Sequence, residues 1–279
     1  MNENTRMEFK DWKEMKRQER DALITAQRDA LMDVFMTGES LTEYLVGRGR
    51  LGSHLTSGNA ALVLQAKPDA RVVMNYEGWK RFGRPVGKGE EGIAALTRYN
   101  GFLNVERLFD ISQTHGNKPY PVTEIANDPE QIQTALKALE ELCLVPVYKT
   151  KTENPPIIYS REEKTIFWNE DANPVETFKL LPVAMVQATA DLHNEEASKE
   201  SLTQLFGIAV SVELCGRFGI PLLEGAAEQL NSYRDHVEIG LEREALESVR
   251  ELTKTLGDHI AKNLVNQKAA PQPSKQEVR

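Results

Sequence analysis

The chain has few residues that could cross-link it and no segment that could hold it in a membrane. Its 279 residues include only two cysteines, Cys143 and Cys215, which lie far apart in apolar stretches. Such thiols are expected to be free and buried in a cytoplasmic protein. No run of about 18 apolar residues is present, so no membrane partner is expected. The amino terminus is charged and has no apolar signal segment, which predicts a cytoplasmic location.

Motifs of the common enzyme classes are also missing. The sequence has no Walker loop, no Gly-x-Gly-x-x-Gly after a predicted strand, no Gly-x-Ser-x-Gly and no Cys-x-x-Cys pair. None of its five histidines lies four residues from another, although a zinc-binding helix of a metallopeptidase requires that spacing. We therefore predict no catalytic residue, no metal ligand and no cofactor.

Charge is distributed unevenly along the chain. The net charge is −8, but residues 48–107 hold ten Lys and Arg against five Asp and Glu. Residues 111–279 hold 17 basic and 26 acidic residues. A basic region on an acidic protein is the electrostatic pattern of a local nucleic-acid site. The acidic second half is instead suited to a protein partner.

Hydrophobic spacing predicts an α+β fold in two domains. The first, residues 1–120, is predicted as a small α+β domain with a long helix over 7–36 and a β-hairpin around Asn100-Gly101. The second, residues 129–265, is predicted as a mainly helical domain with a short β-sheet, and residues 266–279 as a disordered tail. Between predicted helices at 40–46 and 57–66, Gly47–Gly52 is expected to be a flexible basic turn. The last long helix is predicted to run unbroken over 226–264.

The segment Trp79–Gly92 is the candidate binding site. Four cations lie there among four glycines, with two aromatic residues beside them. Cations neutralise phosphates, glycines allow close backbone approach, and flat rings stack on bases. Two structural alternatives to DNA binding stay open for this segment. The cations could lie on a solvated turn, and Trp79 could be a core residue of the domain.

Three blocks in this half resemble the amino-terminal domain of ArdC/LtrC-like proteins of plasmids and conjugative elements. The blocks are Asn59–Pro68, Trp79–Gly92 and Leu108–Thr114, and the resemblance spans about residues 41–121. It implies binding of single-stranded DNA. Together with the local chemistry it nominates these residues as nucleic-acid-binding: Asn59, Trp79, Lys80, Arg81, Arg84, Lys88 and Gly89. Asp110 is expected to cap a turn.

Members of that family usually carry a zinc metallopeptidase domain with a His-Glu-x-x-His helix. Here Val186, Gln187 and Ala190 fall at the three motif positions, so the resemblance implies a degenerate, zincin-like domain. The leading hypothesis is a non-enzymatic accessory protein of a plasmid, conjugative element or prophage, with an antirestriction association. One alternative is an active metallopeptidase that rebuilt its site from four residues, namely Asp191, His193, Glu195 and Glu196. Another alternative is an interaction scaffold that uses the acidic half. The sequence predicts no oligomeric state.

Overall fold

The computed structural model describes residues 9–52, 54–118, 124–151, 155–193 and 200–269. Within these ranges the chain is mainly helical and has two three-stranded sheets, which confirms the predicted α+β class. The helices are α1 Phe9–Val34, α2 Gly38–Leu51, α3 Ser57–Ala66, α4 Tyr76–Phe82, α5 Pro129–Glu140, α6 Pro174–Leu192, α7 Glu200–Phe218, α8 Ala226–His236 and α9 Glu242–Ala269. The strands are β1 Val73–Asn75, β2 Ile93–Tyr99, β3 Phe102–Asp110, β4 Val147–Thr150, β5 Ile157–Ser160 and β6 Thr165–Asn169, and a short 3-10 turn, η1, spans Ile111–Gln113.

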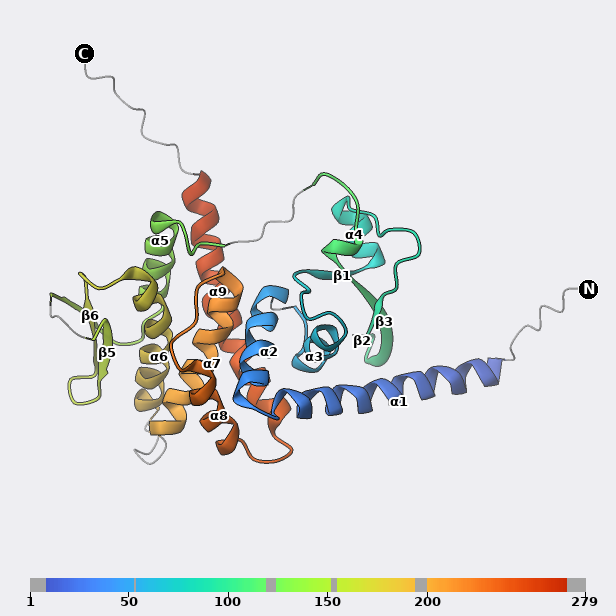
Figure 1. Ribbon diagram of the computed structural model, residues 1–279, viewed down its shortest axis with the longest axis horizontal. Helices are drawn as coiled ribbons and strands as arrows, with labels where there is room; N and C mark the ends of the chain where they lie inside the picture. The colour runs from blue at the N-terminus through green and yellow to red at the C-terminus, as the bar shows by residue number, and fades with distance from the viewer. Residues whose placement is uncertain (1–8, 53, 119–123, 152–154, 194–199, 270–279) are drawn as a thin grey trace, which may run out of the picture.

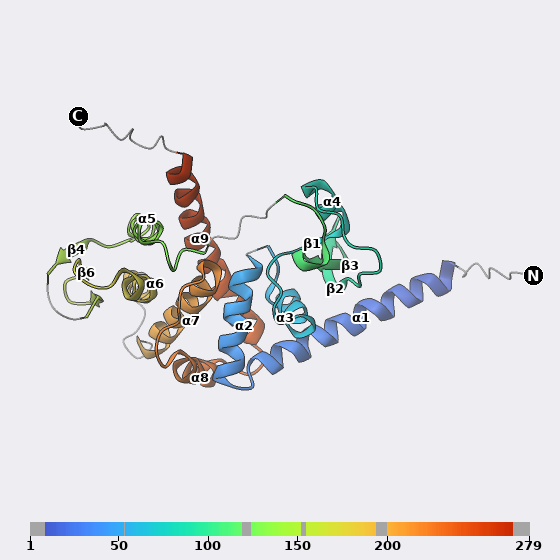
Figure 2. The ribbon, with the colours of Figure 1, turned by 45° about the horizontal axis from the view of Figure 1, so that its top comes forward.

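The two sheets lie at opposite ends of a helical body (Figure 1). The first is antiparallel in the order β1-β3-β2, and the second has the order β4-β6-β5 with β4 parallel to β6. Helix α3 lies between α2 and the first sheet, and α1 runs beneath that sheet (Figures 1 and 2). None of the described helices has the length and apolar content needed to cross a membrane.

The segment Gly47–Gly52 is not the predicted turn. Helix α2 begins at a capping box formed by Thr37 and Ser40 and continues through the segment to Leu51. Arg48 is 1% exposed, and its guanidinium donates to the carbonyls of Gly52 and Leu55. Gly47 and Gly49 allow close packing against Leu64 and against the backbone of α7, and Gly52 ends the helix with a φ of 81°. Tertiary contact therefore overrides the local signal for a flexible turn.

Helices α2 and α7 cross with their backbones in contact. A Cβ atom added at Gly49 would overlap the carbonyl oxygen of Glu213, and one added at Gly216 would overlap that of Val46. One hydrophobic core cluster accordingly contains Leu41 and Leu45 of α2 together with residues of α7. The first sheet and the helical half are therefore joined through a shared core, and the division into domains at 120 and 129 stays a prediction.

Two predicted element boundaries are wrong. The predicted helix over 226–264 is two helices, because the chain leaves helical geometry after His236 and Gly240 adopts a φ of 94°. Helix α9 then continues to Ala269, so residues 266–269 are helical rather than part of a disordered tail. No proline precedes position 271 there to stop the helix. The rest of the predicted tail, and residues 119–123 of the predicted linker, lie outside the described residues.

The α2–α7 crossing makes a testable prediction about stability. Gly49→Ala places a methyl group against backbone, which cannot rotate away, and should lower the free energy of unfolding by about 1–3 kcal/mol. Gly47→Ala in the same helix meets only the Leu64 side chain and should cost less. Thermal unfolding followed by circular dichroism checks both variants. Equal melting temperatures for the two would contradict the packing argument.

Candidate functional site

Trp79 is a core residue of the first sheet. Asn75 caps the start of α4, which ends at Gly83 with a φ of 87°. On this helix Trp79 is 0% exposed, and its indole Nε1 donates to the carbonyl oxygen of Phe109 at 2.7 Å. It packs with Val72 and Phe109 in a small separate cluster. The predicted role of Trp79 in base stacking is therefore wrong, since neither face of its ring is open, and the alternative core position holds.

Asn59 also has a structural role. It lies in the first turn of α3, is buried, and its Oδ1 accepts from Gln27 Nε2 at 2.6 Å and from the Leu96 backbone N–H at 2.9 Å. Its Nδ2 donates to the Leu96 carbonyl oxygen at 2.8 Å. These bonds fix α3 against β2 and α1, and they occupy the amide that the sequence assigned to nucleic acid.

Arg84 holds a loop in the described structure. Its Nε donates to Thr114 Oγ1 at 2.9 Å, and its Nη1 donates to the carbonyls of Gly116 at 2.8 Å and Lys118 at 2.9 Å. This half-buried guanidinium therefore has a structural role, and its predicted phosphate contact stays a prediction.

Asp110 caps η1, as the sequence predicts. Burial opposes its ionisation, but hydrogen bonds from Ser112 and from the backbone N–H groups of Arg71 and Val72 hold the pKa of Asp110 below its ordinary value.

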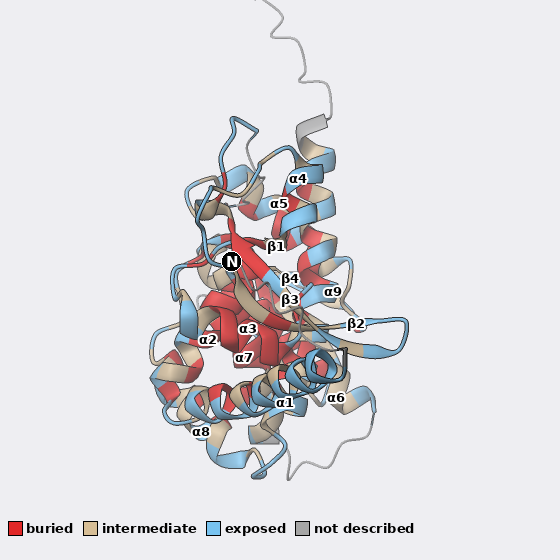
Figure 3. Cartoon of the chain, turned by 90° about the vertical axis from the view of Figure 1, so that its right-hand side faces the viewer, coloured by how far each residue is buried: buried red, intermediate tan, exposed pale blue. Residues whose placement is uncertain are grey.

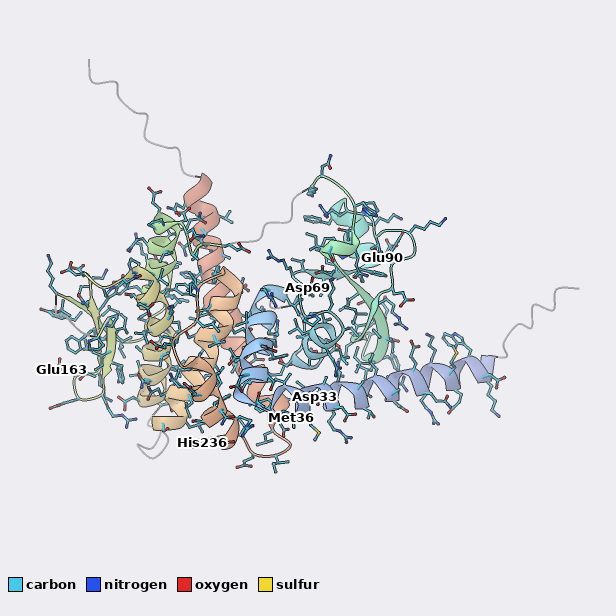
Figure 4. The ribbon with its side chains drawn as sticks, in the orientation of Figure 1. Asp33, Met36, Asp69, Glu90, Glu163 and His236 are labelled. Atoms are coloured by element: carbon cyan, nitrogen blue, oxygen red, sulfur yellow. The ribbon has the colours of Figure 1, made fainter. Side chains whose placement is uncertain are left out.

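The remaining predicted cations are exposed. The side chains of Lys80 and Lys88 form no hydrogen bond or ion pair with any described residue, and Arg81 Nε donates to the Glu77 carbonyl at 3.4 Å. Gly89 has a φ of 88° with open space around it, so this loop needs a glycine for its backbone conformation. Glu90 lies on the same loop (Figure 4). The positions of these cations are compatible with phosphate contacts, and their role stays a prediction.

A cleft of about 600 Å³ lies on the first sheet, and the sequence did not predict it. It is bordered by α1, the start of α3, the strands of the sheet and the first turn of α9. Asn59 alone of the predicted site residues lines it. The lining comprises Ile24, Gln27, His54, Leu55, Thr56, Asn59, Val73, Met74, Asn75, Gly78, Ala95, Leu96, Thr97, Arg98, Leu103, Glu106, Leu108 and Arg243.

The cleft wall combines apolar and polar residues and carries two exposed cations. Arg243 donates to Gln27 Oε1 at 3.3 Å, and Gln27 in turn donates to Asn59, so a chain of hydrogen bonds joins α9, α1 and α3. The Arg98 side chain forms no hydrogen bond or ion pair with any described residue. Glu106, also on the cleft wall, accepts a hydrogen bond from Asn75 Nδ2. A guanidinium with free donors is suited to a phosphate or to the edge of a base.

The helix at the metallopeptidase position carries no metal-binding group at the motif positions. Val186 is buried and aliphatic, and Gln187 and Ala190 follow it on α6. In the described part of the chain no cluster of three or more His, Cys, Asp or Glu side chains is placed to hold a metal ion.

The alternative metal site was composed of Asp191, His193, Glu195 and Glu196. The carboxylate of Asp191 is engaged by other side chains. Asp191 accepts from Tyr159 at 2.7 Å and from Arg161 at 3.0 Å, while Glu195 and Glu196 lie outside the described residues. Burial and this carboxylate raise the pKa of Tyr159 to about 12.

Comparison with known proteins gives structural similarity only. No protein-family model matches the chain, and no curated protein matches it. The metal-free structure of the antirestriction protein ArdC from plasmid R388 has a TM-score of 0.44 at 14% identity, covering 75% of this chain and 85% of that chain. Its Mn(II)-bound structure has a TM-score of 0.48 at 14% identity. That similarity covers 82% of this chain and 98% of that chain. The DNA-binding site proposed below is argued from this chain's own residues.

The structural role of Arg84 makes a prediction that a phosphate-binding role does not. Arg84→Ala should lower the free energy of unfolding by about 1–3 kcal/mol, because three carbonyl and hydroxyl acceptors lose a charged donor. Lys88→Ala, on the same loop, should leave the melting temperature unchanged. Differential scanning calorimetry of the two variants separates the cases. An Arg84→Ala protein as stable as the wild type would show that the loop does not depend on this guanidinium.

Proposed function

We propose that the protein binds single-stranded DNA along the cleft of the first sheet. The observation that carries the proposal is the cleft itself, which places the exposed Arg98 and Arg243 on the wall of one open groove. Lys80 and Lys88 add exposed positive charge on α4 and the loop after it. The cations would supply most of the affinity through phosphates, and the affinity would depend on salt.

A single strand fits this surface better than a duplex. Readout of a duplex requires a helix or ribbon with base-reading side chains that enters the major groove. Helix α1 alternates acidic and basic residues, α3 is apolar, and Arg48 of α2 is buried. The basic residues of α4, Lys80 and Arg81, lie on a helix of only seven residues and are not accompanied by base-reading amide side chains on that helix. A groove with a few cations and amides is the arrangement that follows a flexible backbone with little sequence preference.

We further propose that the protein is not an enzyme. An aliphatic side chain at position 186 and an alanine at 190 offer no lone pair to zinc, and a glutamine at 187 cannot act as a general base. The antirestriction association with a plasmid, conjugative element or prophage follows from the family resemblance. A protein partner for the acidic half stays a prediction.

Affinity for a labelled oligothymidylate, measured by fluorescence anisotropy at two salt concentrations, tests the function. Arg98→Ala with Arg243→Ala should weaken binding at least tenfold, about 1.4 kcal/mol. The same variant should lower the salt slope by about one to two units, because each guanidinium lost removes a phosphate contact.

The matched control is Lys254→Ala with Lys262→Ala, which removes the same charge from exposed positions of α9. It should bind like the wild type. Absence of binding at low salt, or equal affinity for duplex and single strand, would contradict the proposed function. Equal losses in both double variants would show diffuse electrostatic attraction without a site.

A further inference from the structure

The tip of the β2–β3 hairpin exposes two aromatic rings. Tyr99 is 71% exposed and Phe102 is 75% exposed, on either side of Asn100 and Gly101. The hairpin projects from the body of the molecule, and its tip is coloured as exposed (Figure 3). Large apolar rings at the end of a projecting element mark a surface that contacts something else.

The strand pairing places both rings on one face of the sheet. Tyr99 pairs directly with Phe102, so their side chains leave the hairpin on the same side. Side chains alternate along a strand, which puts Thr97, Asn104 and Glu106 on that same side. Thr97 and Glu106 line the cleft, so the two rings stand at its outer end on a continuous surface.

Folding of the hairpin does not require these rings. Asn100 and Gly101 have φ values of 49° and 81°, the positive values that a two-residue turn of this kind needs, and this pair of residues favours it strongly. Neither ring belongs to a hydrophobic core cluster of the described residues. A cross-strand aromatic pair adds only modestly to the stability of a sheet, whereas an aromatic ring stacked on an unpaired base contributes substantially to the affinity for a single strand.

We propose that Tyr99 and Phe102 are the base-stacking platform of the DNA site, and that the strand continues from them into the cleft past Thr97 and Asn104. This inference rests on the proposed function. It adds an aromatic surface for base stacking, which the buried Trp79 cannot provide. The ligand feature recognised at the tip is the flat face of an unpaired base, which every base possesses. The backbone phosphates are recognised separately, by the cations of the cleft.

The test compares two probes, a labelled oligothymidylate and an abasic oligomer of the same length that keeps the phosphates. Tyr99→Ala with Phe102→Ala should weaken binding of the oligothymidylate at least tenfold. It should leave binding of the abasic oligomer and the salt slope unchanged, because no charge is removed. Tyr99→Phe with Phe102→Tyr keeps both rings and should restore the affinity.

The control variant is Tyr148→Ala with Ile158→Ala on the second sheet, where the side chains are 62% and 50% exposed. It should bind both probes like the wild type. The wild type and the variant lacking both rings could bind the oligothymidylate equally well. That result would refute the stacking platform and leave the proposed DNA-binding function standing. Equal loss for both probes refutes it too, since the rings would then act through the shape of the hairpin. A wild type that binds neither probe refutes the proposed function together with this inference.

Discussion

The close crossing of α2 on α7 is the contact that the rest of the structure depends on. With glycine at 49 and 216 the two backbones touch, and the side chains around the crossing become buried. Among them is Glu213, whose pKa is raised to about 7 by burial, against the attraction of Arg48, Arg250 and Arg217.

From this crossing a series of polar contacts leads to the cleft. Arg48 fixes the loop before α3 through the carbonyls of Gly52 and Leu55. The backbone N–H of Ser57, at the start of α3, donates to Glu247 of α9 at 2.7 Å. The first turn of α9 is thereby held beside the first sheet, where Arg243 reaches Gln27. The proposed DNA site is therefore built from both halves of the chain, and its geometry depends on a helix crossing at some distance from it.

Local signals predicted the elements whose conformation is decided locally. The Asn100-Gly101 turn, the cap at Asp110 and the helix at α6 all follow from short-range rules. Local sequence signals predicted the wrong conformation where contact with a segment distant in the sequence determines it. Gly47–Gly52 has the composition of a flexible turn, and only its contact with α7 makes it a helix.

The proposed cleft overlaps the region that the sequence nominated, but Asn59 alone of the nominated residues lines it. Trp79 and Arg84 have the chemistry of DNA contacts, but Trp79 is buried against the sheet and Arg84 holds a loop. Arg243 was missed because nothing in the sequence places α9 beside the first sheet. Tyr99 and Phe102 carried a usable signal: two aromatics bordering a two-residue turn must share one face and extend into solvent.

Photochemical crosslinking tests the central claim most directly, because it reports which residues touch the bases. Single-stranded DNA carrying bromodeoxyuridine would be irradiated in complex with the full chain, and the modified peptides identified by mass spectrometry. The account predicts crosslinks on the β2–β3 hairpin, centred on Tyr99 and Phe102, and on the residues that line the cleft. Crosslinks confined to the second sheet and α5, or to the loop after α4 alone, would contradict it.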